Sequence, residues 1–295
     1  MYLRALTSVF CLLMFLGSVT SAPAQFEEAR FESDGVDIRY VTAGEGDPVI
    51  LVHGFTATAA ANWMLPGVFS RLAQGYQVIA IDARGHGGSG KPHDPEAYGE
   101  KMVKDVVHLM DHLGIDRAHV GGYSMGGFIT MKLLATAPER LRSAIVGGAG
   151  WMRPEDDQSL MEAIAQSLES GGGAAPLLEA LTPEGETIAP EAMQAMNAQV
   201  LATNDPLALA AVARGMPNLA VDRKDIEFNT VPVLVVIGSK DPLKEGVDAM
   251  SDVLGNHETV VVDGADHISI LINPVYSKQM TDAMVSFLEA RCDCE

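Results

Sequence analysis

Short, unbroken apolar runs alternate with amphipathic stretches along most of the chain. Val49–Val52 and Val78–Ile81 contain no polar side chain, and Val231–Gly238 is also apolar; strands buried on both faces of a parallel sheet have this composition. Met102–Leu113 instead repeats apolar residues at helical spacing. Because strands that alternate with helices require crossover connections, the pattern predicts an α/β fold with a mostly parallel central sheet flanked by helices.

The same alternation places the remaining elements of the core. Ala29–Val41 alternates around Ser33-Asp34-Gly35, which predicts a hairpin, because Gly accepts the positive φ of a tight turn. We expect further strands at residues 118–121, 143–147 and 259–262 and further helices at residues 63–73, 125–137 and 276–288.

The pattern changes in residues 151–226, where strand-like runs are absent. Helical patterns are found at residues 160–168, 193–200 and 207–214. Gly171-Gly172-Gly173 separates the first of them from the others and supplies a flexible joint. We interpret residues 151–226 as a helical cap inserted into an α/β core of residues 25–150 and 227–295, where it covers an active site.

Residues 1–24 have the three parts of a secretory signal peptide. Arg4 supplies the positive charge, Val9–Val19 is the apolar segment, and Ala22-Pro23-Ala24 is a cleavage site of the A-x-A type. A retained membrane anchor is the alternative, but the apolar run is shorter than the ~20 residues that a spanning helix needs. The sequence therefore predicts an exported protein, periplasmic or secreted, with no stable membrane anchor after the signal is removed.

Composition and charge narrow the range of partners. The 295 residues are 47% hydrophobic and 20% charged, which is typical of a globular chain with an ample core. A formal net charge of -19, with scattered Lys and Arg, argues against nucleic acid and anionic membrane surfaces as partners. Once Cys11 leaves with the signal, Cys292 and Cys294 remain. A disulfide between them would close a small, strained ring, and a metal site would need further ligands.

The strongest chemical motif is Gly122-Tyr123-Ser124-Met125-Gly126. A predicted strand precedes it and a predicted helix follows it, which is the arrangement of a nucleophile elbow. Glycines allow such a sharp turn, and we expect Ser124 to have a positive φ. Ser124 is the candidate nucleophile, and the backbone N–H of Met125, at the start of the helix, is a candidate oxyanion donor.

Two other glycine-containing segments follow buried strands. In His53-Gly54-Phe55, the N–H of Phe55 is the second candidate oxyanion donor. Asp82–Gly90 suggests phosphate binding, but it does not match the spacing G-x-x-x-x-G-K-[ST]. We therefore favour a structural loop held by Asp82 and Arg84.

The candidate acid and base come late in the chain. Asp241 directly follows one late apolar run, and His267 follows the last predicted strand. Because the carboxyl ends of parallel strands share one edge of the sheet, both side chains are expected within reach of Ser124. The chain order Ser, Asp, His is that of one class of catalytic triad. Asp263 and Asp266 are competing candidates for the acid.

Together, these motifs resemble the α/β-hydrolase superfamily over residues 29–290. The resemblance rests on His53-Gly54-Phe55, Asp82–Ser89, Gly122–Gly127, Gly238–Asp241 and Asp266-His267. It is greatest for the capped branch of serine esterases, lactonases and cofactor-free haloperoxidases. It implies a serine hydrolase that cleaves carboxylic ester or lactone bonds of small, fairly apolar substrates through an acyl-enzyme, with Ser124, Asp241 and His267 as its triad. Neither a metal nor an organic cofactor is expected.

Related activities remain as alternatives. Haloalkane dehalogenases and epoxide hydrolases of the superfamily have Asp at the elbow, so Ser124 argues against both. C–C bond hydrolases share a G-x-S-M-G-G elbow but often have Asn at the position of Tyr123. A haloperoxidase- or perhydrolase-like activity would use the same triad, and a hydrolase fold can also bind a ligand without turnover.

Overall fold

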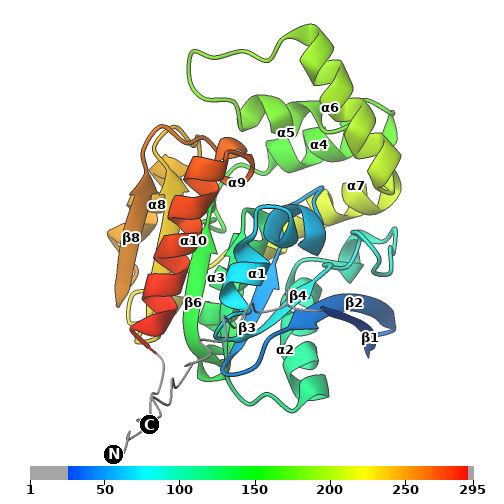
Figure 1. The fold of residues 1–295 in the computed structure, drawn as a ribbon. Helices are drawn as coiled ribbons and strands as arrows, with labels where there is room; N and C mark the ends of the chain where they lie inside the picture. The colour runs from blue at the N-terminus through cyan, green and yellow to red at the C-terminus, as the bar shows by residue number, and fades with distance from the viewer. Residues whose placement is uncertain (1–25, 292–295) are drawn as a thin grey trace, which may run out of the picture.

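The computed structural model describes residues 26–291, so the expected signal peptide and the Cys292–Cys294 pair lie outside the described residues. Within this range, eight strands form one sheet in the order β1-β2-β4-β3-β5-β6-β7-β8 (Figure 1). The strands are β1 (Glu27–Ser33), β2 (Val36–Ala43), β3 (Pro48–Val52), β4 (Gln77–Ile81), β5 (Ala118–Tyr123), β6 (Leu141–Gly147), β7 (Val233–Gly238) and β8 (His257–Val262). The pairs β1–β2 and β2–β4 are antiparallel and all other neighbours are parallel. The predicted mostly parallel α/β sheet is confirmed.

Helices cover both faces of this sheet, as Figure 1 shows. They are α1 (Val68–Leu72), α2 (Glu100–Leu113), α3 (Met125–Thr136), α4 (Ser159–Glu169), α5 (Ala175–Ala180), α6 (Pro190–Thr203), α7 (Pro206–Gly215), α8 (Lys244–Ser251), α9 (Ser269–Ile272) and α10 (Pro274–Glu289). Short 3-10 turns lie at Pro95–Ala97, Pro138–Arg140, Met216–Leu219 and Arg223–Asp225. None of the helices within residues 26–291 has both the length and the apolar character needed to cross a bilayer.

Strand β3 shows why its sequence is apolar without alternation. Ile50 and Val52 pack into the core layer that contains α2 and α3, whereas Val49 and Leu51 pack into the layer that contains α1 and α10. Successive side chains of a strand point to opposite faces, so a strand between two helical layers must be apolar at every position. All four of these side chains are fully buried.

The predicted hairpin and its turn are confirmed. β1 pairs with β2 from Glu27 to Ser33, and the connection consists of Asp34 and Gly35. Both residues have positive φ, 50° and 77° respectively. Two-residue turns with positive φ at both positions match the twist of an antiparallel pair, and Asp-Gly is one of the few dipeptides that adopts them readily.

The single helix predicted at residues 63–73 is wrong. The segment contains a π-helical turn, η1 (Ala60–Met64), and the separate short helix α1. Pro66 and Gly67 lie between them, and Gly67 has a φ of 86°. Proline lacks the N–H that a continuous helix uses, and a left-handed glycine ends a helical turn, so the break follows from these two residues.

Other boundaries also differ from the sequence prediction. β7 begins at Val233 and not at Val231, because the intervening Pro232 cannot donate to the ladder. Helices α5, α8 and α9 were not predicted. They are short, and α8 contains the poor helix former Gly246.

Helices α4 to α7 fill the region between β6 and β7, above the carboxyl edge of the sheet (Figure 1). Helices α4 and α7 pack through an apolar cluster of their own, formed by Ile164, Ala165, Leu168, Leu209, Ala210 and Ala213. On their exposed side, Arg214 of α7 pairs with Glu162 and Glu169 of α4. The helical patterns predicted at residues 160–168, 193–200 and 207–214 correspond to α4, α6 and α7.

Candidate active site

Ser124 lies at the junction of β5 and α3. Its φ and ψ are 54° and -116°, so the predicted positive φ is confirmed. A residue with a Cβ rarely adopts this conformation. The Ser124 N–H donates to the carbonyl of Gly147 at the end of β6, which anchors the turn to the neighbouring strand.

Two glycines on either side of Ser124 make the sharp turn possible. A Cβ at Gly122 would lie 1.9 Å from the carbonyl oxygen of Gly126, and a Cβ at Gly126 would lie 2.1 Å from the carbonyl oxygen of Val52. Neither contact is compatible with a side chain. The glycines of the motif are therefore required for α3 to start directly against β3 and β5.

The structure brings Ser124, His267 and Asp241 into one hydrogen-bonded chain. His267 Nε2 is 3.0 Å from Ser124 Oγ, and His267 Nδ1 is 2.8 Å from Asp241 Oδ2. An ionised carboxylate only accepts hydrogen bonds, so Nδ1 carries the proton of the neutral ring and Nε2 accepts from the serine hydroxyl. This arrangement can transfer the hydroxyl proton to the imidazole.

A second hydrogen bond fixes the carboxylate of Asp241 beside the His267 ring. Its Oδ1 accepts the backbone N–H of Leu243 at 2.9 Å, and both Asp241 and His267 are buried. The competing acids have other partners: Asp263 accepts from the Ser239 hydroxyl, and Asp266 accepts the N–H groups at the start of α9. Asp241 is therefore the carboxylate that contacts His267 Nδ1.

The environment of Asp266 fits a helix-capping function. Burial raises its pKa, but hydrogen bonds from the N–H groups of Ser269 and Ile268 and from the Ser269 hydroxyl oppose this, and the net pKa lies below its ordinary value. Its carboxylate is thus bound to the helix start and is not available to orient the His267 ring.

His267 reaches Ser124 from β8, across the ends of β7 and β6. The loop after β8 approaches the end of β7 closely, because a Cβ at Gly238 would lie 2.3 Å from the carbonyl oxygen of Ala265. In addition, Lys240 N–H donates to that same carbonyl. The absence of a side chain at Gly238 allows the loop to cross the strand end.

Tyr123 holds the loop after β8 at His267. The sequence patterns assigned no role to Tyr123. Its hydroxyl donates to the backbone carbonyl of His267 at 2.6 Å, and the two rings lie 5.2 Å apart. The ring passes over the end of β6, where a Cβ at Gly148 would lie 2.6 Å from Tyr123 Cζ. Burial, followed by the negative charge of Asp241, holds the pKa of Tyr123 well above its ordinary value, so the hydroxyl stays a donor.

The segment Gly54-Phe55 lies against Ser124. A Cβ at Gly54 would be 3.2 Å from Ser124 Cβ, which places the following peptide unit beside the serine. The first N–H groups of a helix have no intrahelical acceptor, so the N–H of Met125, at the start of α3, can donate to a substrate oxygen. The positions of Phe55 and Met125 are compatible with a two-donor oxyanion hole.

Asn62 holds the Gly54-Phe55 segment through a hydrogen bond. The sequence patterns assigned no role to this residue either. Its side-chain Oδ1 accepts the N–H of Gly54 at 2.6 Å, and the residue is buried within η1. No motif identifies Asn62 in the sequence. The only available signal is a polar residue immediately before Trp63, the first residue of the helix predicted at residues 63–73.

A pair of buried histidines lies behind the site. His53 Nδ1–H donates to the carbonyl of Gly54, and its Nε2 accepts the N–H of Ala83, an arrangement that only a neutral ring can form. Burial lowers the pKa of His53, and burial together with the nearby His53 lowers the pKa of His86 to about 3. Both rings are therefore uncharged structural groups at neutral pH.

The Asp82–Gly90 loop is structural, as predicted. Asp82 accepts the N–H groups of Ala59 and Gly88 and pairs with Arg39. Arg84 is buried and forms a bidentate pair with Asp105 of α2. The groups that would hold a phosphate are thus bound within the protein.

Ser124 lines a cavity of about 770 Å³ that is covered by helices α5 and α6. Residues from the loop after β3, from η1, from the end of β5 and from α9 form its floor, and Leu177, Leu178, Leu181, Ala195, Met196, Gln199, Val200, Thr203 and Asn204 form its roof. Helix α6 has no fully buried residue, and one of its faces lines the cavity. Among the described residues, no group of three or more His, Cys, Asp or Glu side chains is arranged to hold a metal ion.

Comparisons with known proteins agree with this fold. A family model described as alpha/beta hydrolase fold matches residues 47–189. The chain is 28% identical to the 2-hydroxy-6-oxo-6-(2'-aminophenyl)hexa-2,4-dienoic acid hydrolase of Metapseudomonas resinovorans, covering 91% of this chain and 93% of that protein. It is 27% identical to 3-oxoadipate enol-lactonase 2 of Acinetobacter baylyi, over 85% and 93% of the two chains. Among solved structures, the enol-lactonase of Burkholderia xenovorans LB400 superposes with a TM-score of 0.74 at 21% identity, covering 88% of this chain and all of that one.

Proposed function

Because the chain belongs to the α/β-hydrolase superfamily, we propose that it is a serine hydrolase that cleaves carboxylic ester or lactone bonds of small, fairly apolar substrates. The observation that supports this most directly is the hydrogen-bonded chain from Asp241 through His267 to Ser124, which ends in an apolar cavity. A hydroxyl, a base and an orienting acid in this order form the machinery of acyl transfer.

In the first half of the reaction, His267 Nε2 takes the proton of Ser124 while Oγ attacks the substrate carbonyl. Asp241 keeps the ring in the tautomer that accepts this proton and stabilises the imidazolium that forms. His267 then returns the proton to the leaving oxygen, and the alcohol departs. In a lactone, this alcohol remains attached to the acyl group.

The N–H groups of Phe55 and Met125 stabilise the negative charge on the carbonyl oxygen, and each such donor contributes about 3 kcal/mol in comparable sites. In the second half, His267 removes a proton from water, which attacks the acyl-enzyme and releases the acid. The mechanism requires no metal or organic cofactor.

The cap favours apolar substrates. Leu177, Met196 and Val200 face the cavity from above, and methionine adapts to substrates of different shape. The few polar groups near Ser124 are those that would orient the reacting carbonyl, as in most small-molecule sites.

Hydrolysis of a C–C bond is the second candidate. It is favoured by the similarity to the dienoic acid hydrolase over nearly the full length of both chains. Such a substrate carries a carboxylate, so a C–C hydrolase needs a cationic group in its cavity. Among residues 26–291, those that line the cavity include His267 but no Lys or Arg, which favours the ester or lactone reaction.

An activity screen with the purified protein tests the proposal. The substrates are p-nitrophenyl acetate and butanoate, a set of γ-lactones and a 2-hydroxy-6-oxohexa-2,4-dienoate, each also assayed with Ser124→Ala. We expect steady ester or lactone turnover, an acyl adduct on Ser124 by mass spectrometry and no turnover by the folded variant. Turnover of the dienoate alone would instead support the C–C hydrolase, and a single burst of product would support a binding protein without turnover.

A further inference from the structure

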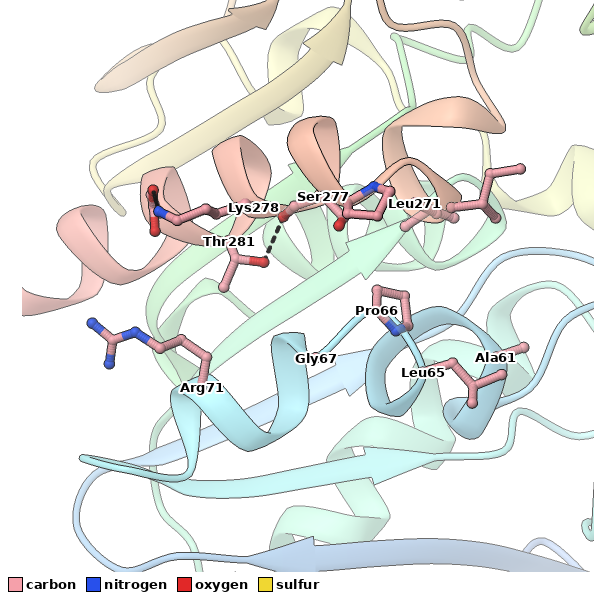
Figure 2. A pocket seen from close by; sticks show the side chains of 12 residues that line it. Ala61, Leu65, Pro66, Gly67, Arg71, Leu271, Ser277, Lys278 and Thr281 are labelled. Atoms are coloured by element: carbon pink, nitrogen blue, oxygen red, sulfur yellow. Dashed lines mark hydrogen bonds and ion pairs between the residues drawn. The ribbon is translucent and has the colours of Figure 1, made fainter. Parts of the chain in front are cut away.

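A second hollow, of about 700 Å³, lies beside the candidate active site. It is a groove between the segment that contains η1 and α1 on one side and helices α9 and α10 on the other (Figure 2). Five of its residues, Pro274, Ser277, Lys278, Thr281 and Asp282, recur at helical spacing along one face of α10. At a rise of 1.5 Å per residue, the groove follows this face of α10 for about 12 Å.

The groove and the active-site cavity share part of their walls. Ala61 of η1 and Leu271 and Ile272 of α9 line both hollows. Helix α9 begins two residues after His267, so the residues at this junction lie close to the reacting groups. The two hollows therefore adjoin at Ala61, Leu271 and Ile272.

The groove is apolar at one end and charged at the other. At the junction, Leu65 and Ile272 are 84% and 73% exposed, although both are large apolar side chains. Figure 2 shows Ala61, Leu65 and Leu271 at one end and Arg71 and Lys278 at the other. Exposed apolar side chains that flank a hollow next to a catalytic site are typical of ligand contact, and the charged end opens to water.

We propose that this groove binds the long, unbranched acyl chain of an ester substrate whose carbonyl is attacked by Ser124. The inference rests on the proposed ester hydrolysis and extends its substrate range from small acids to acids with one long chain. The first methylenes occupy the cavity, the next pass between Ala61 and Leu271, and the distal part contacts Leu65 and Ile272. The end of the chain lies near Arg71 and Lys278, where it meets solvent.

This proposal predicts how the rate depends on chain length. Each methylene that leaves water contributes up to about a fourfold gain in kcat/KM. The gain should continue from p-nitrophenyl acetate through octanoate to dodecanoate, because the groove accommodates carbons that the cavity alone does not. All esters are used below their critical micelle concentrations.

Two substitutions test whether the acyl chain passes from the cavity into the groove. Leu65→Glu places a charge on the apolar wall, and Ala61→Phe narrows the junction. Both positions are exposed, and melting temperatures verify folding. We expect each variant to lower the ratio of kcat/KM for dodecanoate to that for acetate by about tenfold or more, the equivalent of a few methylenes. The matched control is Phe228→Glu, which changes an apolar side chain of equal exposure, 83%, that lines neither hollow and should leave the ratio unchanged.

The outcomes separate this proposal from the proposed function. If short esters are hydrolysed but the dodecanoate-to-acetate ratio is the same in wild type, Leu65→Glu and Ala61→Phe, the groove proposal is wrong and the esterase proposal stands. If no ester is hydrolysed, the esterase proposal fails, and calorimetric titration with dodecanoate tests the groove directly. Binding that is lost in Leu65→Glu and retained in Phe228→Glu supports the groove, and equal binding or none overturns it.

Discussion

The hydroxyl of Tyr123 donates to the backbone carbonyl of His267 at 2.6 Å. Tyr123 is the last residue of β5, whereas His267 lies in the loop after β8, 144 positions further along the sequence. Tyr123 directly precedes the candidate nucleophile, and His267 is the candidate base, so this bond connects the serine turn to the histidine loop. It fixes the distance between them independently of the hydrogen bond that the reaction breaks and reforms.

Tyr123→Phe should therefore impair catalysis through the position of His267. Loss of one buried hydrogen bond costs about 1–3 kcal/mol of stability, because the carbonyl is left without its partner. We expect kcat to fall by roughly tenfold with a small change in KM, since imidazole misplacement affects the chemical step.

The control for this variant is Tyr98→Phe. Tyr98 also donates its hydroxyl to a backbone carbonyl, that of Pro92, away from the Ser124–His267 pair. Both variants should lose similar stability in urea unfolding, but only Tyr123→Phe should lose kcat. Equal kcat values for the two would show that the Tyr123 bond has a structural function alone.

Substitutions within the triad should be strongly non-additive. Ser124→Ala should lower kcat/KM nearly as much as the double change with His267→Ala, because the residues act as one unit. Asp241→Asn should keep the fold and lower kcat by up to about 10⁴-fold, since the amide favours the wrong imidazole tautomer.

Asp263→Asn is the matched control, because Asp263 is a nearby carboxylate that contacts Ser239 and not His267. Its kcat should stay close to that of the wild type. A harmless Asp241→Asn together with an inactive Asp263→Asn would transfer the role of the acid to Asp263.

Asn62→Ala should weaken the oxyanion hole without removing a donor. Its Oδ1 holds the N–H of Gly54, and release of that N–H lets the Gly54-Phe55 peptide rotate away from the developing charge. A displacement of about 1 Å can cost up to 10²-fold in rate, so we expect a 10- to 100-fold lower kcat. Asn229→Ala, which removes a similar bond to the Val231 N–H far from the site, should not change kcat; a comparable loss there would point to a general effect on stability.

Acid should destabilise the fold through His53 and His86. The folded-state pKa of both is lowered, that of His86 to about 3, whereas unfolded histidine has a pKa of about 6.5. Between these values the unfolded chain binds protons that the folded chain excludes. The free energy of unfolding is therefore highest above pH 6.5 and falls below it, through His86 by up to about 1.4 kcal/mol per pH unit down to about pH 3, and His53 acts in the same direction.

Urea unfolding at pH 7.5, 6, 5 and 4 measures this slope. His86→Asn should be less stable at pH 7.5 but should lose less stability on acidification. If the free energy of unfolding of His86→Asn falls with pH as steeply as that of the wild type, protonation of His86 does not contribute to acid destabilisation.

Export remains a prediction from residues 1–24 of the sequence. Mature protein from the periplasmic or extracellular fraction should begin near Gln25, because cleavage is expected after Ala22-Pro23-Ala24. N-terminal sequencing checks this. An intact Met1 in protein purified from the soluble cytoplasmic fraction would contradict it.

The α/β class, most strands and the residues that meet in the candidate site follow from local sequence patterns. Strands such as β3 are apolar at every position because both faces are covered, and that signal is local. The Gly122–Gly126 turn is equally local, since its glycines and Ser124 are adjacent in the chain. Asp241 and His267 could be selected because the carboxyl ends of parallel strands meet at one edge.

The way in which these residues are held depends instead on contacts between segments that are distant in the sequence. Tyr123, Asn62 and the bare backbone at Gly238 each act on a partner from a distant segment, and no local pattern encodes such a partner. Asp241, Asp263 and Asp266 all follow late strands, so the sequence does not distinguish them as candidate acids. They differ in the hydrogen-bond donors that surround them in the folded protein, and Asp241 is the one that contacts His267. The hollows have the same origin: their walls come from the core, the cap and α9, and a cavity exists only where such surfaces meet without filling the space between them.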